Sequence, residues 1–316
     1  MSNSQGSFDA RYEVDPVPHD REQLRANRDK LTSIGRDKPG EQVRIEFPRA
    51  NTNTKLGAIF TVSPQFLSDP DPKRVILGKR IENLNNCQLS ENACNGQVKA
   101  QIMLDGLGEG DEPAKSMSEF IEKLHKVQNH KLIVLAPHGG NIEPWTDVEA
   151  EYVANRFGDS ASLWLCKGFS SRNPNGDSNE DATERWHITS TQINPESFPK
   201  LKSIIAPTPN FEYSIAFHGW TEDSICVGGN PHNPDADLKC DIRGAIMKAL
   251  EEANPDLKVH VSPCPDRNFN GDSSDNIVNR LGTNAIQIEQ CKIARTKYHD
   301  KIAQAVVNAI GTRINV

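Results

Sequence analysis

The feature that most constrains the fold is a change in hydrophobic periodicity about a third of the way along the chain. In the segment QVRIEF the apolar residues Val43, Ile45 and Phe47 alternate with polar ones, as they do in a half-buried strand. The segments GAIFTV, RVILGK and QVKAQIML continue this period of two between turn residues. We therefore predict a small antiparallel β-module over residues 41–110, whose role the sequence does not reveal.

After the linker DGLGEGDEP, helical and strand patterns alternate. SMSEFIEKLHKV has apolar residues at helical spacing and predicts a helix, whereas KLIVLA is a continuous apolar run typical of a strand covered on both faces. Further strands are predicted at SLWLC, YSIAFH, SICVGG, LKVHVS and AIQIEQ, and helices at TDVEAEYVANRF, LKCDIRGAIMKALEEA and IARTKYHDKIAQAVVNAI. This alternation predicts an α/β domain over residues 111–316, with a mixed open sheet and helices on both faces.

The first forty residues are polar and rich in charge, proline and glycine, so we expect a polar N-terminal arm over 1–40. The chain starts without the apolar segment of a signal peptide, and no stretch reaches membrane-spanning length. We therefore expect a protein that is cytoplasmic or released without a signal peptide, and that has no membrane partner. The net charge of −7, from 43 acidic and 36 basic residues, argues against a nucleic-acid partner, because phosphate contacts need concentrated Lys and Arg.

The seven cysteines show no CxxC pair. Cys87 and Cys94 lie close together in a polar segment, where a disulfide or a metal clip is conceivable. Because the export signal is missing, the favoured expectation is that the thiols are reduced and unpaired.

Three ionisable residues lie at the carboxyl ends of predicted buried strands, where open α/β sheets bind their ligands. His138 follows LIVLAP, His218 follows SIAF, and Glu289 closes AIQI. Glu143 comes five positions after His138, across a Gly-Gly turn. The backbone freedom of these glycines would let both side chains point to one place.

Two histidines and one glutamate are the ligands of many catalytic zinc sites, which leave a fourth position open for water. Such a site also needs a carboxylate outside the metal that serves as general base and acid. The pattern assigns His138, Glu143 and His218 to the metal and Glu289 to catalysis. Each signal also has an ordinary explanation by itself: a structural or solvent-facing histidine, a simple turn, or an anion near the start of a helix.

Five sequence blocks occur in order, namely APHGGNIEPWTDVEAE, WHITST, AFHGW with VGGNP, NIVNRLG and IQIEQCKIAR. Through these blocks the chain resembles, over about residues 131–310, the poly-γ-glutamate hydrolase family of phages and bacteria. The resemblance implies a zinc-carboxypeptidase-like α/β fold, Zn2+ as the cofactor, and cleavage of γ-glutamyl amide bonds. Matched motif by motif, it also implies metal ligands at His138, Glu143 and His218 and a catalytic carboxylate at Glu289.

A substrate carboxylate would need a partner, and the planar guanidinium of arginine can bind it bidentately. The candidates near the blocks are Lys167, Arg185, Asn279, Arg280 and Arg295. His187 in WHITST could line the pocket or hold a turn through hydrogen bonds. Trp145 and Trp220 each follow a proposed ligand by two positions and could line the substrate-binding cleft. Packing in the apolar core is the more common explanation for either tryptophan.

The favoured function is a zinc-dependent hydrolase of amide bonds, acting on a γ-glutamyl polymer or a peptide-like substrate. A net charge of −7 repels a polyanion at long range, so either the cleft is locally basic or the substrate is smaller. Two alternatives stay open. One is the same zinc chemistry on a peptidoglycan stem peptide or a small acylated amino acid, and the other is a non-catalytic binding protein on a hydrolase fold.

Overall fold

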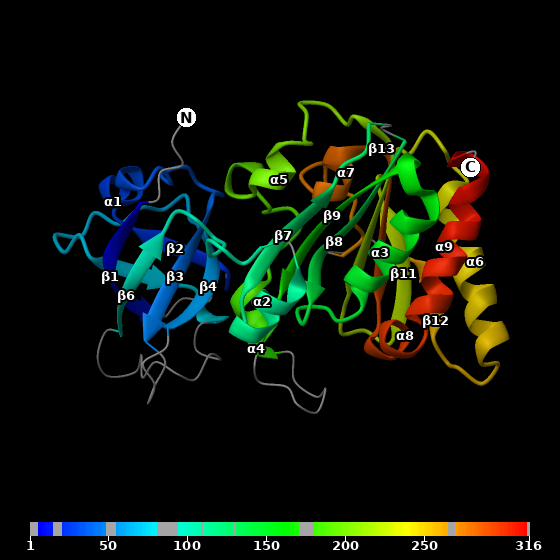
Figure 1. Cartoon of the computed structure of the whole chain (residues 1–316), viewed down its shortest axis with the longest axis horizontal. Coiled ribbons are helices and arrows are strands. Elements are labelled where there is room, and N and C mark those ends of the chain that lie inside the picture. Colours follow the sequence, from blue (N-terminus) through cyan, green and yellow to red (C-terminus); the bar gives the residue numbers. More distant parts are fainter. Residues whose placement is uncertain are drawn as a thin grey trace. The chain divides into compact units, whose positions relative to one another are not determined.

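The structure is a computed structural model whose elements are labelled in Figure 1. It describes residues 6–14, 21–48, 55–80, 94–108, 110–128, 131–170, 180–264 and 269–314. The chain divides into two compact units. Unit 1 comprises residues 1–121 and 168–199, and unit 2 comprises residues 122–167 and 200–316. Among the described residues, no helix combines the length and the apolar character needed to cross a membrane.

Unit 1 contains a closed six-stranded barrel with the strand order β1-β5-β2-β4-β3-β6. Its elements are β1 (Ser7–Val14), β2 (Gln23–Ala26), α1 (Arg28–Ser33), β3 (Gln42–Pro48), β4 (Lys55–Val62), β5 (Arg74–Leu77) and β6 (Cys94–Lys99). The other helical elements that lie wholly in this unit are α2 (Asp111–Met117), α4 (Glu180–Trp186) and η3 (Pro195–Ser197). The predicted strands are present, but β1 pairs with β5 and β2 with β4 in parallel, so the module is not the antiparallel one expected.

The polar arm expected over residues 1–40 differs from what its described residues form. They supply β1, β2 and α1, and β1 places Phe8, Ala10 and Tyr12 in the barrel core. This period of two is present in the sequence, but the strand's partner β6 lies far along the chain, where Ser7 pairs with Lys99. The alternating pattern of β1 is interrupted by charged residues, and it does not indicate that the strand pairs with one about ninety residues further along the chain.

Strand β3 is buried on both faces rather than one. Its Arg44 donates to both carboxylate oxygens of Glu119, over 2.6 and 2.9 Å, and to Glu46 over 3.0 Å. Gly57 on the neighbouring strand leaves room for this guanidinium, because a Cβ there would lie 2.2 Å from Arg44 Nη2. A buried, bidentate ion pair thus explains how a polar side chain occupies an interior position.

Unit 2 is built on a seven-stranded sheet with the order β12-β11-β13-β10-β8-β9-β7. The strands are β7 (Phe120–His125), β8 (Leu132–Gly140), β9 (Ala161–Gly168), β10 (Phe211–Gly219), β11 (Ser224–Gly229), β12 (His260–Pro263) and β13 (Gly282–Gln290). The helical elements are α3 (Thr146–Phe157), η2 (Gly158–Ser160), α5 (Pro199–Lys202), α6 (Leu238–Ala253), α7 (Ile277–Leu281), α8 (Lys292–Lys297) and α9 (His299–Ile314). Strand β13 runs parallel to β10 and antiparallel to β11, which confirms a mixed sheet.

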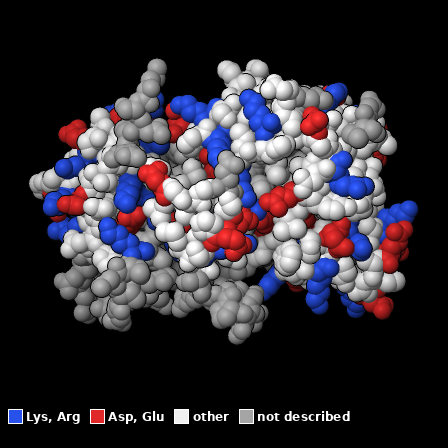
Figure 2. Space-filling model, viewed as in Figure 1, with Lys and Arg blue, Asp and Glu red and all other residues white. Residues whose placement is uncertain are grey.

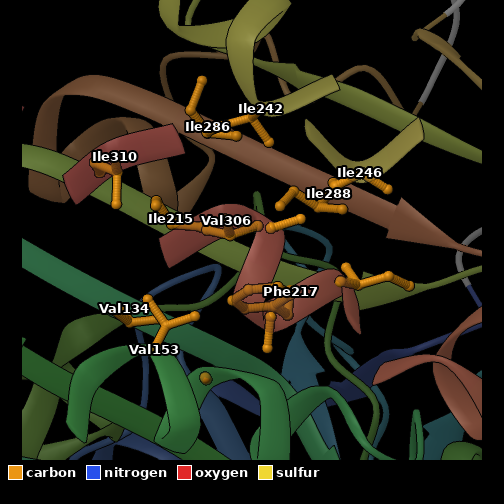
Figure 3. Packing of buried hydrophobic residues seen from close by; sticks show 14 of the residues in the cluster. Val134, Val153, Ile215, Phe217, Ile242, Ile246, Ile286, Ile288, Val306 and Ile310 are labelled. Atoms are coloured by element: carbon orange, nitrogen blue, oxygen red, sulfur yellow. The ribbon is translucent and has the colours of Figure 1, made fainter. Parts of the chain in front are cut away.

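The main apolar core of unit 2 lies between the sheet and helices α3, α6 and α9. Figure 3 shows Ile286 and Ile288 of β13 on the same side as Ile242 of α6. The alternate residues point to the opposite face, where Ser214 of β10 donates to the backbone carbonyl of Val278 in α7. Helices therefore cover both faces of the sheet, as predicted.

The helix predicted over SMSEFIEKLHKV is wrong. Helix α2 ends at Met117, because Ser118 adopts a left-handed conformation with φ 56°, and strand β7 follows. Glu122 of β7 is buried and accepts hydrogen bonds from Trp164 Nε1 over 2.9 Å and Leu201 N over 2.7 Å. Tertiary partners of this kind override a helical pattern of apolar residues.

The cysteines also depart from the expectation of reduced thiols. Cys226 of β11 forms a disulfide with Cys264, just after the neighbouring strand β12. Cys94 is disulfide-bonded as well, while Cys87, its suggested partner, lies outside the described residues. The pairing of β11 with β12 brings together two cysteines that are 38 residues apart, which no local spacing indicates.

Removal of the Cys226–Cys264 disulfide, by a double substitution to alanine, should lower the free energy of unfolding by about 2–4 kcal/mol. The cross-link closes a loop of 38 residues and restricts the unfolded chain. Urea denaturation of the double variant measures the change, and Cys240→Ser at an exposed free thiol serves as the control. An unchanged unfolding midpoint in the double variant would contradict the expected stabilisation.

Candidate metal centre

Three neighbouring strands carry the residues of the candidate site. Strands β8, β10 and β13 run parallel, so their carboxyl ends meet at one edge of the sheet. His138 lies near the end of β8, and His218 and Glu289 lie near the ends of β10 and β13, where they pair directly in register. The sequence prediction of buried strands that end in ionisable residues is confirmed for all three.

Glu143 returns to His138 through a tight turn after β8. Its backbone N–H donates to the carbonyl of His138 over 2.8 Å, and Gly140 in the turn has a φ of 71° that favours glycine. Thr146, the first residue of α3, donates its hydroxyl to the Glu143 carbonyl over 2.8 Å. The turn is therefore fixed from the strand side and from the helix side.

The side chains of His138, Glu143 and His218 converge on one place, as the sequence predicts. Glu143 Oε1 lies 3.0 Å from His138 Nδ1, and Glu143 Oε2 lies 3.5 Å from His218 Nδ1. The two Nδ1 atoms of His138 and His218 are 3.2 Å apart, and the ligand atoms of all three residues lie within 4.8 Å of one another. The three side chains are buried, and the N–H of Gly219 orients the carboxylate by donating to Glu143 Oε2 over 2.9 Å.

This donor set fits a transition-metal ion. Two imidazole nitrogens and a carboxylate oxygen are ligands that zinc accepts, and a three-residue set leaves a position for a reacting molecule. Two facing Nδ1 atoms that are both unprotonated would repel each other, and a cation between them and the carboxylate removes that conflict.

Two carboxylates at the centre have opposite electrostatic environments. Burial acts to raise the pKa of Glu143, but the charges and hydrogen bonds of His138 and His218 outweigh burial and hold this pKa well below its usual value. Burial, followed by the negative charge of Glu143, raises the pKa of Glu289 well above its usual value. A pair of carboxyl groups whose pKa values are driven apart is the arrangement that separates ligand and acid–base roles.

Gln287 is a residue of the centre that the sequence prediction missed. Its Nε2 donates to Glu289 Oε1 over 2.8 Å, and its Oε1 accepts from Asn276 Nδ2 over 2.7 Å. Asn276 in turn caps α7 by accepting from Val278 N. The period of two in AIQIEQ places Gln287 and Glu289 on the same face of β13, and this signal could have identified it.

Arg295 is the candidate cation that lies beside the centre. Its Nη1 donates to the carbonyl of Pro144 over 3.0 Å, and a Cβ on Gly219 would lie 2.5 Å from its Nε. Burial lowers the pKa of Arg295, while the charge of Glu143 acts in the opposite direction. The structure therefore places this guanidinium close to the Glu143 carboxylate.

Other predicted substrate-binding residues have partners of their own. In unit 1, Arg185 Nε donates to the carbonyl of Gly57 over 2.8 Å, and His187 Nδ1 lies 2.6 Å from Glu22 Oε1. These contacts are those of residues that hold unit 1 together. In unit 2, Lys167 forms ion pairs of 2.8 Å and 2.6 Å with its acidic neighbours Asp147 and Glu151.

Asn279 and Arg280 belong to α7, which leads into the start of β13 rather than its end. Asn279 Nδ2 donates to the carbonyls of Gly271 and Ser273, over 2.7 Å in each case. A role of Asn279 and Arg280 in substrate binding stays a prediction.

Together, the fold and the site define the class: an α/β protein with a buried two-histidine, one-glutamate cluster at the carboxyl edge of its sheet. The profile described as poly-gamma-glutamate hydrolase matches residues 112–310. The chain belongs to the poly-gamma-glutamate hydrolase family. Family and fold together support a hydrolase.

Solved structures to which the chain is similar include a bacteriophage poly-gamma-glutamate hydrolase, with 21% identity and a TM-score of 0.48 over 62% of this chain and 90% of that chain. An N-acetylmuramoyl-L-alanine amidase from Clostridium difficile 630 has 16% identity and a TM-score of 0.35, over 60% of this chain and 98% of that one. A metallo-carboxypeptidase from Burkholderia cenocepacia has 11% identity and a TM-score of 0.36, over 87% and 80%. No curated protein matches the sequence significantly.

Proposed function

We propose that the protein is a zinc-dependent hydrolase of γ-glutamyl amide bonds. The observation that carries the proposal is the convergence of His138, Glu143 and His218 within 4.8 Å, with Glu289 in register beside His218. Membership of the poly-gamma-glutamate hydrolase family supports the γ-glutamyl linkage. The three converging residues would hold the ion, and Glu289 would act on the substrate.

The proposed reaction breaks the amide C–N bond and forms a C–O bond to water. Zinc, when bound, supplies a Lewis acid that polarises the scissile carbonyl and makes a water molecule more acidic. Glu289 takes a proton from the attacking water and gives it to the departing nitrogen, so that the amine leaves neutral. A raised pKa suits a carboxyl group that must take up and release a proton in one cycle.

Two further side chains position the reacting groups. The hydrogen bond from Gln287 holds Oε1 of Glu289, which leaves the other carboxylate oxygen for the proton transfer. Arg295 is fixed beside Glu143 by the Pro144 carbonyl, and its Nε is buried without a hydrogen-bond partner among the described residues. This guanidinium would bind the α-carboxylate of the glutamyl group.

A panel of linkages tests the function. The zinc-loaded protein should release glutamate from poly-γ-glutamate or γ-Glu-Glu and leave α-Glu-Glu intact, as measured by chromatography of the products. A Glu289→Gln preparation, purified in parallel, shows whether any activity comes from a contaminating enzyme. Cleavage of the α-linked dipeptide alone, or of a peptidoglycan stem peptide alone, would replace the γ-glutamyl assignment with the other amide substrate.

A further inference from the structure

Trp145 is an exposed aromatic residue directly beside the metal centre. It follows the ligand Glu143 by two positions, so their Cα atoms lie at most about 7 Å apart. One face of its ring stacks on His299, with centroids 4.3 Å apart and an interplanar angle of 18°. The side chain is nevertheless 40% exposed, which excludes the core-packing role considered from the sequence.

The backbone at Trp145 is strained. Its φ of 82° lies in the left-handed region, which bulky residues rarely adopt, and it directly precedes the first residue of α3. Strain of this kind persists where the surrounding structure enforces it and clusters at ligand-binding sites. A tryptophan that is both strained and exposed points to a function for its free ring face.

A second aromatic group, Phe269 with Trp220, is linked to residues of the candidate site. Phe269 is 59% exposed, and its ring meets Trp220 edge to face, with centroids 6.5 Å apart. Trp220 follows the ligand His218 by two positions and is fixed by a 2.7 Å hydrogen bond from its Nε1 to the carbonyl of Ser224. The Phe269 carbonyl accepts from Gln287 Nε2, the same group that holds Glu289.

The charges near the centre suit a substrate with few carboxylates. Lys167 is paired with two carboxylates. Arg295 donates to the Pro144 carbonyl and is the cation that the proposed mechanism assigns to the glutamyl carboxylate. On the face drawn in Figure 2, basic and acidic side chains of the described residues are interspersed. A polyanion is bound best by a continuous run of basic side chains.

We propose that Trp145, and Phe269 with Trp220, form two walls of a subsite for an apolar or aromatic group on the amine side of the scissile bond. The inference rests on the proposed γ-glutamyl hydrolysis. The γ-glutamyl group carries a charged α-carboxylate and an α-amino group, which aromatic rings would not bind well. The aromatic residues would therefore contact the leaving group, which is released as the amine. The preferred substrate class is therefore a γ-glutamyl conjugate of an apolar amino acid or amine.

The test compares γ-Glu-Phe with γ-Glu-Glu as substrates of the zinc-loaded protein. The wild type should have the higher kcat/KM for γ-Glu-Phe, and Trp145→Gly or Phe269→Ala should lower this preference about 3- to 10-fold, mainly through KM. Glycine tolerates the φ of 82°, so Trp145→Gly should keep the melting temperature of the wild type. Met247→Ala, at a 53% exposed residue of α6, is the matched control and should leave both rates unchanged.

Binding without turnover separates the subsite from the chemistry. γ-Glu-Phe and γ-Glu-Glu are each titrated calorimetrically into Glu289→Gln and into the double variant Glu289→Gln/Trp145→Gly. The added Trp145→Gly should weaken γ-Glu-Phe binding about 3- to 10-fold, as in the kinetic test. Equal losses of affinity for the two ligands would overturn the subsite, because Trp145 would then only stabilise the candidate site. Hydrolysis of γ-Glu-Glu without preference for γ-Glu-Phe would overturn the subsite and leave the proposed function standing, whereas binding of γ-Glu-Phe without any hydrolysis would overturn the function.

Discussion

Glu289→Gln is expected to retain zinc at the wild-type stoichiometry and to lose about 100- to 10,000-fold in kcat. The carboxamide has nearly the same shape as the carboxyl group but cannot accept a proton from the attacking water. Burial and the charge of Glu143 raise the pKa of Glu289, so an uncharged side chain suits the site and the unfolding midpoint should not fall. Steady-state kinetics and elemental analysis of one preparation measure both properties.

Gln287→Ala is the companion variant for this experiment. It removes the hydrogen bond to Oε1 of Glu289 but keeps the carboxyl group, so it should reduce kcat less than Glu289→Gln does.

Wild-type turnover in Glu289→Gln would contradict the acid–base role. Loss of zinc from that variant would instead make Glu289 a ligand, in addition to the three converging residues.

His138→Ala should weaken zinc binding by at least about 100-fold, because it removes one of three protein ligands and even residues behind the ligands contribute 10- to 100-fold. Removal of one imidazole also leaves the buried Glu143 carboxylate with less positive charge, so the metal-free variant should unfold at a lower denaturant concentration than the metal-free wild type. Competition with a chelating dye measures zinc affinity, and urea denaturation measures the stability.

The matched control is His232→Ala, at an exposed histidine outside the three converging residues, which should keep zinc affinity and turnover. Chelation of the wild type should abolish hydrolysis, and added zinc should restore it. Full activity in a preparation shown to be free of metal would contradict the proposed mechanism, whatever the affinity of the variant.

The parts of the molecule that the sequence predicts well are those whose evidence is local. The apolar run before His138 marks β8, and the Gly-Gly pair marks the turn that returns Glu143. The ends of β10 and β13 are marked in the same way by His218 and Glu289. Because parallel neighbouring strands end at one edge of the sheet, these local patterns were enough to predict that His138, His218 and Glu289 lie at the same edge.

The parts that the sequence misses depend on distant partners. Arg44 is buried because Glu119 neutralises it from 75 positions away, and β1 joins the barrel because β6 pairs with it. In the same way, the sequence does not reveal that Arg185 donates to the Gly57 carbonyl, 128 positions away. Whether a polar side chain is buried depends on whether a hydrogen-bonding or charged partner lies close to it in the fold. A local sequence pattern does not contain that information.

The position of β13 between β10 and β11 sets an order in which the centre can be completed during folding. The three residues proposed to hold the metal come from β8, from the turn after it and from the adjacent β10. The proposed catalytic carboxylate, Glu289, comes from β13, the last strand of the described chain. Under the proposed mechanism, a chain folded only as far as β10 could bind zinc but could not yet hydrolyse a substrate, and activity would begin only when β13 joins the sheet.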